Sequence, residues 1–390
     1  MGLFWPGRIL IGTSGWDYDD WVGPFYEEKE RRLSQYCRVF ETTEINSTFY
    51  SLPTPGLMKG LARATPRGFV FAAKLYKGIT HEKKLNPKLG VESLLAEYLR
   101  SAEPLRKEGK LGPILVQMPP KPRKEFPYFE DFLALLPDGY RFAVEFRDLS
   151  WLSEDVFKLL EKYSVAYVIV DEPLLPPVVR VTSDIAYIRW HGRGERPWYY
   201  YLYSEDELRE WVPRVREAAE SARAVYGYFN NHFRGYAPRN ALQMLKLLNL
   251  ARPTQLTVLR RMNEYSRAGA VARAMMAASK ALAAGDYEKA LASLTTPSRM
   301  RRGVEIPESQ VKFEEVSPTA VRARVKEYKV IIDLERRVLA HDCADWEKIK
   351  DERRLCKHVV RVISMLPPEM KKRVLEDLAA NLNLWEFTGI

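Results

Sequence analysis

The chain has 390 residues, of which 46% are hydrophobic and 29% charged, and its formal net charge is +10. This length allows two domains with sizeable cores, and no apolar run reaches the roughly 18 residues of a membrane span. The first residues lack the charged and apolar regions of a signal peptide, and three cysteines are too few for a disulfide framework. We therefore expect a cytoplasmic protein that does not enter a membrane.

Residues 1–250 are predicted to form strands that alternate with helices. The eight candidate strands lie at 8–12, 40–46, 69–74, 113–118, 141–146, 166–171, 186–191 and 224–230. Most are continuous apolar runs, which are typical of a parallel sheet covered on both faces. Eight strand–helix units in about 250 residues favour an α/β fold of the TIM-type (β/α)8 barrel class. A doubly wound open sheet is the alternative, but no Gly-x-Gly-x-x-Gly motif follows the first strand.

Polar side chains follow the predicted strands, at the face where barrel enzymes build their active sites. Any one of them could instead be a cap or a loop hydrogen bond, but together they favour a polar pocket. The candidate catalytic residues are Glu44, Asn46, Lys74, Glu145, Arg147, Asp171, His191, Arg193, Asn230 and His232.

Several of these candidates suit acid–base chemistry. Glu44 and Glu145 follow the second and fifth strands, and a barrel can bring such carboxylates together across its mouth. When two carboxylates lie close together, the pKa of one of them is raised. The protonated carboxyl could then act as an acid and the ionised one as a base near neutral pH. His191 and His232 could act as a general base or as ligands of a metal in the barrel.

The cationic candidates indicate an anionic substrate. Lys74 ends an apolar strand, so it could be a desolvated amine or the partner of a carboxylate. Arg147 and Arg193 could bind phosphate or carboxylate groups in bidentate fashion. The mixture favours a polar substrate such as a phosphorylated sugar or a nucleotide.

This region resembles a known family over nearly its full length. The motifs that carry the resemblance include IGTSGWDYDDW (11–21), TTEINSTFYSLP (42–53), AVEFRDLSW (143–151), IRWHGR (188–193) and YFNNHFRGYAPRNAL (228–242). Together they are similar to domain of unknown function 72, the YecE-like TIM-barrel family. The resemblance implies the barrel fold for residues 1–250, but it names no reaction because the chemistry of the family is unsettled.

Residues 251–302 are predicted to form a basic helical hairpin that links two domains. This segment holds ten lysines and arginines and three acidic residues. Clustered cations suit contacts with phosphates, so DNA or RNA is a candidate partner. The alternative is an ordinary solvated helical surface.

Four potential metal ligands follow in residues 303–390, the predicted third segment. His341, Cys343, Cys356 and His358 fall within eighteen positions of a chain that holds only five histidines and three cysteines. Imidazole and thiolate ligands favour zinc, and four of them close a tetrahedral structural site. The sequence predicts a hairpin at 328–339 and a helix that begins beside Cys356, and these elements would hold one Zn²⁺.

Residues 311–366 resemble the SWIM zinc finger, whose pattern is Cys-x-Cys followed by Cys-x-His. Cys356 and His358 match the second half, whereas His341 stands where the family has its first cysteine. The substitution leaves Asp342 or Asp345 as competing oxygen ligands. The resemblance implies a module that docks on DNA or on a protein partner, and it implies no catalysis.

Three functions remain open from the sequence. The first is a barrel hydrolase or lyase that processes or repairs nucleic acid, brought to it by the basic hairpin and the zinc module. The second is a barrel enzyme for a small phosphorylated or sugar substrate, in which the zinc module docks a protein. The third is a non-catalytic adaptor associated with nucleic acid.

Overall fold

The computed structural model describes residues 7–195 and 197–390 of the chain. These residues form two compact units, of which the first ends at Met262 and the second comprises Asn263–Ile390. Among the described residues, every helix is too short or too polar to cross a membrane.

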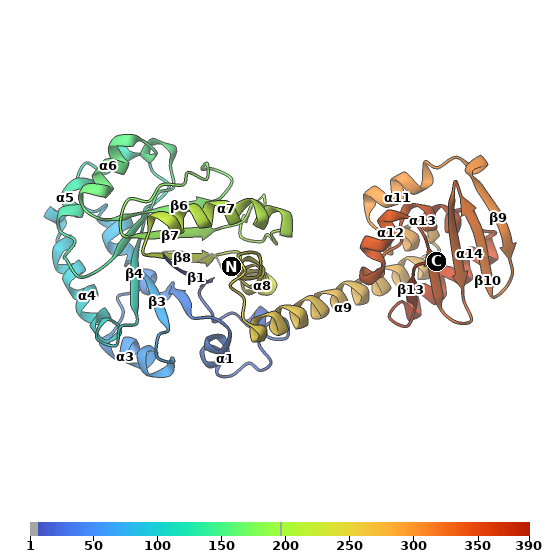
Figure 1. The fold of residues 1–390 in the computed structure, drawn as a ribbon, viewed down its shortest axis with the longest axis horizontal. Coiled ribbons are helices and arrows are strands. Elements are labelled where there is room, and N and C mark those ends of the chain that lie inside the picture. Colours follow the sequence, from blue (N-terminus) through green and yellow to red (C-terminus); the bar gives the residue numbers. More distant parts are fainter. Residues whose placement is uncertain (1–6, 196) are drawn as a thin grey trace. The chain divides into compact units, whose positions relative to one another are not determined.

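The first unit is a barrel of strands (Figure 1). Each strand pairs in parallel with its neighbours, and the eighth strand pairs with the first, so the barrel is closed. This confirms the predicted TIM-type fold. The strands are β1 (Arg8–Ser14), β2 (Thr42–Ile45), β3 (Val70–Lys74), β4 (Leu111–Gln117), β5 (Phe142–Glu145), β6 (Ala166–Asp171), β7 (Ile185–Trp190) and β8 (Ala224–Phe229).

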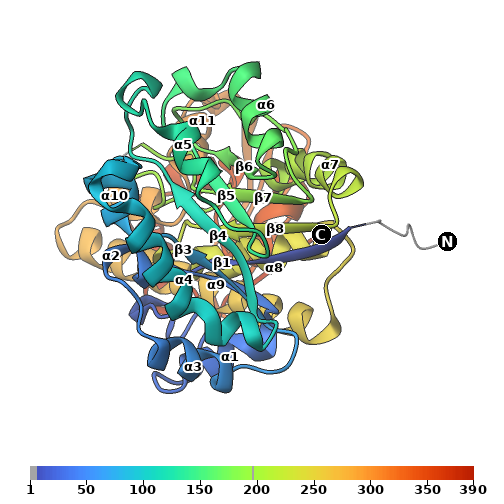
Figure 2. The ribbon, with the colours of Figure 1, turned by 90° about the vertical axis from the view of Figure 1, so that its left-hand side faces the viewer.

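Helices surround this barrel, as Figure 2 shows. The last strand-to-strand connection contains a long helix that begins with a capping box, in which the Ser204 hydroxyl and the Glu207 carboxylate satisfy each other's backbone N–H groups. The barrel helices are α1 (Arg32–Val39), α2 (Ser47–Tyr50), α3 (Pro55–Ala64), α4 (Val91–Lys107), α5 (Phe129–Ala134), α6 (Glu154–Lys162), α7 (Glu205–Ser221) and α8 (Tyr236–Leu247).

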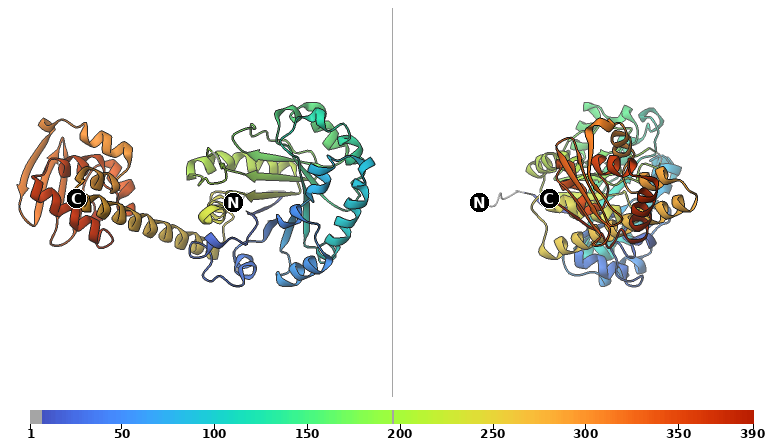
Figure 3. Two further views of the ribbon diagram at one scale, coloured as in Figure 1. Left: turned by 180° about the vertical axis from the view of Figure 1, so that it is seen from behind. Right: turned by 90° about the vertical axis from the view of Figure 1, so that its right-hand side faces the viewer.

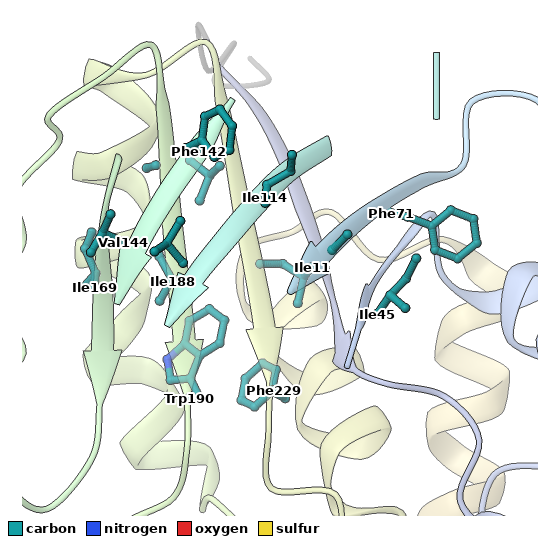
Figure 4. Close-up of a cluster of buried hydrophobic side chains, with 14 of the residues drawn as sticks. Ile11, Ile45, Phe71, Ile114, Phe142, Val144, Ile169, Ile188, Trp190 and Phe229 are labelled. Carbon is teal, nitrogen blue, oxygen red and sulfur yellow. The ribbon is translucent and has the colours of Figure 1, made fainter. Parts of the chain in front are cut away.

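Strand residues alternate between two cores because successive side chains point to opposite faces. One set packs against the helices, and Figure 4 labels Ile11, Ile45, Phe71, Ile114, Phe142, Val144, Ile169, Ile188, Trp190 and Phe229 from it. The other set fills the barrel interior and includes Leu10, Ala72, Leu115, Ala143, Val168, Val170, Tyr187 and Tyr228. Polar residues that continue the second set therefore point into the barrel at the carboxyl ends of the strands.

The second unit is built on a β-sheet (Figure 3), whose five strands follow the order β13–β12–β11–β10–β9. The predicted hairpin at 328–339 is confirmed as the antiparallel pair β11 and β12. The sheet strands are β9 (Val311–Val316), β10 (Ala320–Val325), β11 (Tyr328–Asp333), β12 (Val338–His341) and β13 (Glu386–Thr388).

Helices complete the core of this unit. They are α10 (Tyr287–Ser293), α11 (Pro297–Val304), α12 (Ala344–Ile349), α13 (Lys357–Ser364) and α14 (Pro368–Asn381). The long helix α9 (Pro253–Ala283) begins in the first unit and ends in the second. Segment 251–302 is not a separate hairpin, because Ala290, Leu291 and Leu294 are buried in the same core as Trp346 and Trp385.

Candidate functional site

A buried arginine organises the carboxyl end of the barrel. Arg189, on β7, is 2% exposed, and it donates through Nη2 to Glu44 Oε1 at 2.7 Å and to Ser14 Oγ at 2.9 Å. Its Nη1 donates to Glu145 Oε2 at 2.5 Å. The Tyr187 hydroxyl adds a bond of 2.6 Å to Glu44 Oε2. Two carboxylates from β2 and β5 are thereby held by one guanidinium.

This pairing changes the role expected for the two carboxylates. Burial alone would raise the pKa of Glu145, but the charges of Arg147 and Arg189 outweigh it and hold that pKa well below its ordinary value. From the sequence we expect Glu44 and Glu145 to repel each other, so that one acts as an acid and the other as a base. The arginine between them satisfies both carboxylates, so the geometry does not support that division.

His191 is held as a neutral imidazole beside Glu145. Its Nδ1 lies 3.0 Å from the Asn230 amide nitrogen, and its Nε2 lies 3.1 Å from Glu145 Oε1 and 3.2 Å from Arg147 Nη2. Burial lowers the pKa of His191 to about 3, and the positive charge of Arg147 adds to the effect. This histidine therefore orients Glu145 and carries no exchangeable charge near neutral pH.

Lys74 differs from the other charged groups because it has no carboxylate within ion-pair distance among the described residues. It is the last residue of β3, its exposure is 9%, and its Nζ lies 3.9 Å from the centroid of the Phe49 ring. Burial lowers the pKa of Lys74 to about 8, and the positive charge of Arg189 contributes. A substantial fraction of this amine is therefore neutral at mildly alkaline pH.

Glu172 also belongs to the site, although the sequence analysis did not select it. Arg147 bridges Glu172 Oε2, at 2.7 Å, and Glu145. The Oε1 atom of Glu172 is buried and has no hydrogen-bond partner among the described residues, and burial raises the pKa of this carboxyl. Alternate residues of a strand point to the same face, and Val168 and Val170 of β6 point into the barrel. Glu172 is the next residue of this alternating set, so the pattern along β6 could have identified it.

Asp171 and Arg193 are not brought into this network. Asp171 is one residue out of phase with the inward set, so its carboxylate accepts from Trp211 Nε1 on α7 at 2.6 Å and from Arg193 Nε at 3.0 Å. The two residues form an ion pair, and Arg193 also pairs with Glu210 on α7. Their contacts are those of structural residues.

Of the remaining two candidates, Asn46 belongs to the hydrogen-bond network around Arg189 and His232 does not. Asn46 donates to Ser14 Oγ at 3.2 Å and so joins the site. His232 instead lies in an aromatic stack, with its ring 4.7 Å from Tyr18 and 5.1 Å from Tyr199. Of the residues selected from the sequence, the structure gathers Glu44, Asn46, Lys74, Glu145, Arg147, His191 and Asn230, and it adds Ser14, Glu172, Tyr187 and Arg189.

A second cluster lies in the C-terminal unit. The four potential ligand atoms of His341, Cys343, Cys356 and His358 lie within 4.8 Å of one another, and all four residues are buried. His341 ends β12, whereas Cys343 and Cys356 cap the amino ends of α12 and α13. Among the described residues this is the only such group, and it could hold a metal ion.

The surroundings favour four ligands and no more. The Nδ1 atom of His341 donates to the Lys329 carbonyl, which leaves Nε2 facing the cluster. Asp342 accepts from the Lys329 backbone N–H at 2.9 Å, and Asp345 is bound by the Arg299 guanidinium at 2.8 and 2.9 Å. Both aspartates are therefore engaged elsewhere, contrary to the expectation that they could compete.

The fold and the polar mouth define the first unit as a TIM-type α/β barrel. Residues 10–264 match the family model described as protein of unknown function DUF72, so the chain belongs to this family. That match confirms the resemblance for the barrel. The family match ends at residue 264, so the SWIM resemblance of the C-terminal unit rests only on the residues of that unit.

Related proteins cover the same region. The UPF0759 protein YunF of Bacillus subtilis is 27% identical over 268 residues, which are 62% of this chain and 95% of YunF. The UPF0759 protein YecE of Escherichia coli is 30% identical over 141 residues, 36% of this chain and 48% of YecE. The crystal structure of a DUF72 family protein from Thermotoga maritima aligns with a TM-score of 0.56 and 34% identity, over 62% of this chain and 99% of that one.

Replacing Arg189 by methionine should destabilise the barrel by about 3–5 kcal/mol, because Glu44 and Glu145 would remain buried without their partner. The measurement is a urea titration followed by hydrogen exchange of barrel amides. Arg141→Met is the control, since the Arg141–Asp184 pair is 52% and 41% exposed and its loss should cost no more than about 1 kcal/mol. Equal costs for the two variants would contradict this account.

Proposed function

We propose that the mouth of the barrel is an active site in which the Lys74 amine is the reactive group, in a reaction of the hydrolase or lyase type. The observation that carries the proposal is a buried lysine without a carboxylate partner, at the strand end where barrels place catalytic groups. A desolvated amine beside arginines is available as a base or a nucleophile near neutral pH.

Other polar groups at the mouth of the barrel favour a substrate rich in hydroxyl groups. Glu172 Oε1 is a buried acceptor without a donor, and a substrate hydroxyl would satisfy it. The amides of Asn46 and Asn230 are partly exposed at the same mouth and can bind further oxygens. Sugars present such hydroxyls, whether in nucleic acid or as small phosphorylated molecules.

Nucleic acid is the favoured source of that sugar because the second unit carries unpaired exposed cations. These exposed cations include Arg267, Arg273, Lys280, Lys289, Arg301 and Arg302. Among the described residues, no carboxylate lies within ion-pair distance of any of these six side chains. Phosphate contacts by such residues supply most of the sequence-independent affinity for DNA and RNA. The alternative is a small phosphorylated sugar, with the second unit docked on a protein.

We infer that the cluster in the second unit holds one zinc ion with a structural role. Two thiolates and two imidazoles suit Zn²⁺, and four ligands leave no open position for a substrate. The ligands come from a strand end and two helix starts, so the metal would fix these elements together. The SWIM resemblance supports a docking role for the resulting module.

Turnover should depend on Lys74 and should rise with pH. The Lys74→Met variant is expected to lose about 100-fold or more in kcat/KM, as for removal of a general base. Because the free amine is the active form, the wild-type rate should increase as the pH passes through about 8. The assay uses oligonucleotides with and without abasic sites and phosphorylated sugars, and the exposed Lys158→Met serves as control. Oligonucleotide binding without any turnover would favour the adaptor function.

The full-length protein should contain one zinc per chain, as measured by elemental analysis after dialysis. Cys356→Ser should lose the metal and destabilise the C-terminal unit, because metal binding and folding are coupled in such modules. Cys37→Ser should retain the metal, since Cys37 lies in α1 of the barrel. Zinc retained by Cys356→Ser at wild-type affinity would contradict the assignment.

Binding of an oligonucleotide should weaken as salt increases, with a slope set by the number of phosphates bound. The Arg301→Gln/Arg302→Gln variant should bind more weakly and show a smaller slope, by about one unit for each phosphate that is no longer bound. The matched control replaces two exposed barrel lysines, Lys59→Gln/Lys158→Gln. Equal effects of the two double variants would show that the second unit does not direct binding.

A further inference from the structure

The barrel buries two lysines in very different surroundings. Lys110 is 6% exposed, and its Nζ donates to the carbonyls of Ala62 and Thr65, each at 2.6 Å, and to Thr65 Oγ1 at 3.3 Å. Lys74 is 9% exposed, and its Nζ donates no hydrogen bond to another described residue. A buried ammonium needs acceptors; Lys110 has three of them, whereas the Nζ of Lys74 faces only the Phe49 ring among the described residues.

The neighbours of Lys74 also favour a free amine. The nearby carboxylates of Glu44 and Glu145 are already bound by Arg189, and Glu145 also by Arg147. These arginines repel a further positive charge. With its pKa lowered to about 8 by burial, the Lys74 amine has a neutral fraction that carries a free lone pair near neutral pH.

We propose that Lys74 forms a covalent imine with the C1 aldehyde of an open-chain sugar. This inference rests on the proposed function and specifies its chemistry. The aldehyde has two sources that share the same group: a free sugar phosphate, or a sugar in a nucleic-acid strand that has lost its base. In both, the remaining hydroxyls suit the unpartnered Glu172 Oε1.

The step balances without any other reactant. The Lys74 nitrogen attacks the carbonyl carbon, the C=O π bond breaks, and the oxygen takes up a proton to give a carbinolamine. The carbon–oxygen bond then breaks while the nitrogen lone pair forms the C=N bond. The carbonyl oxygen leaves as water, and the two hydrogens of this water account for the two that the amine has lost.

The experiment is reductive trapping with cyanoborohydride in the full-length protein, followed by peptide mass mapping. One arm uses 2-deoxyribose 5-phosphate and the other an oligonucleotide with a single abasic site. Lys74 should be modified at least tenfold more than the exposed Lys158, while Lys110 stays unmodified. Adduct formation in one arm alone identifies the source of the aldehyde, and adducts in both arms equally support the imine.

The Lys74→Arg variant replaces the amine with a guanidinium, which does not form an imine, so it should form no adduct while remaining folded by circular dichroism. Modification of Lys74 at or below the level of Lys158 in both arms would overturn the inference. Turnover that requires Lys74 without trapping would also overturn it and leave Lys74 as a base. Trapping without turnover would support the imine and count against the proposed reaction.

Discussion

The guanidinium of Arg189 is buried between the carboxylates of Glu44 and Glu145, and the other polar contacts of the barrel mouth depend on it. Without this cation, two buried carboxylates would face each other in a medium of low polarity, and at least one would take up a proton. With it, the Glu44 and Glu145 carboxylates both accept hydrogen bonds from one guanidinium, and the pKa of Glu145 is held well below its ordinary value. Lys74 is consequently the one cation of the group that lacks an anion, which is why its chemistry differs from that of its neighbours.

The sequence was sufficient to predict the barrel and its polar mouth, because apolar strands and polar strand ends are local patterns. Alternate residues of a strand point into the barrel, and the sequence alone does not show which set does so. The prediction chose Asp171, which contacts α7, whereas Glu172, one position later, joins the site. Arg189 and Tyr187 were missed for another reason. They lie within the apolar strand β7, where only the closed barrel shows that their partners come from β1, β2 and β5.

The metal cluster was easier to predict than the barrel site, because its four ligands are rare residue types that lie close together in the chain. The hairpin and the helix start around them also follow from local patterns. The sequence could not show what Asp342 and Asp345 do. Their partners, the Lys329 backbone and the Arg299 side chain, are fixed only by the folded sheet and by α11.

The central claim is that the barrel holds Lys74 as a readily deprotonated amine. A direct test is a pH titration by nuclear magnetic resonance of the full-length protein labelled with ¹³C at the lysine ε-carbons, compared with Lys74→Arg to assign the signal. The account predicts one resonance that titrates near pH 8 and is absent from the variant. If the Lys74 signal titrates instead at the ordinary value of 10.5, the account is contradicted.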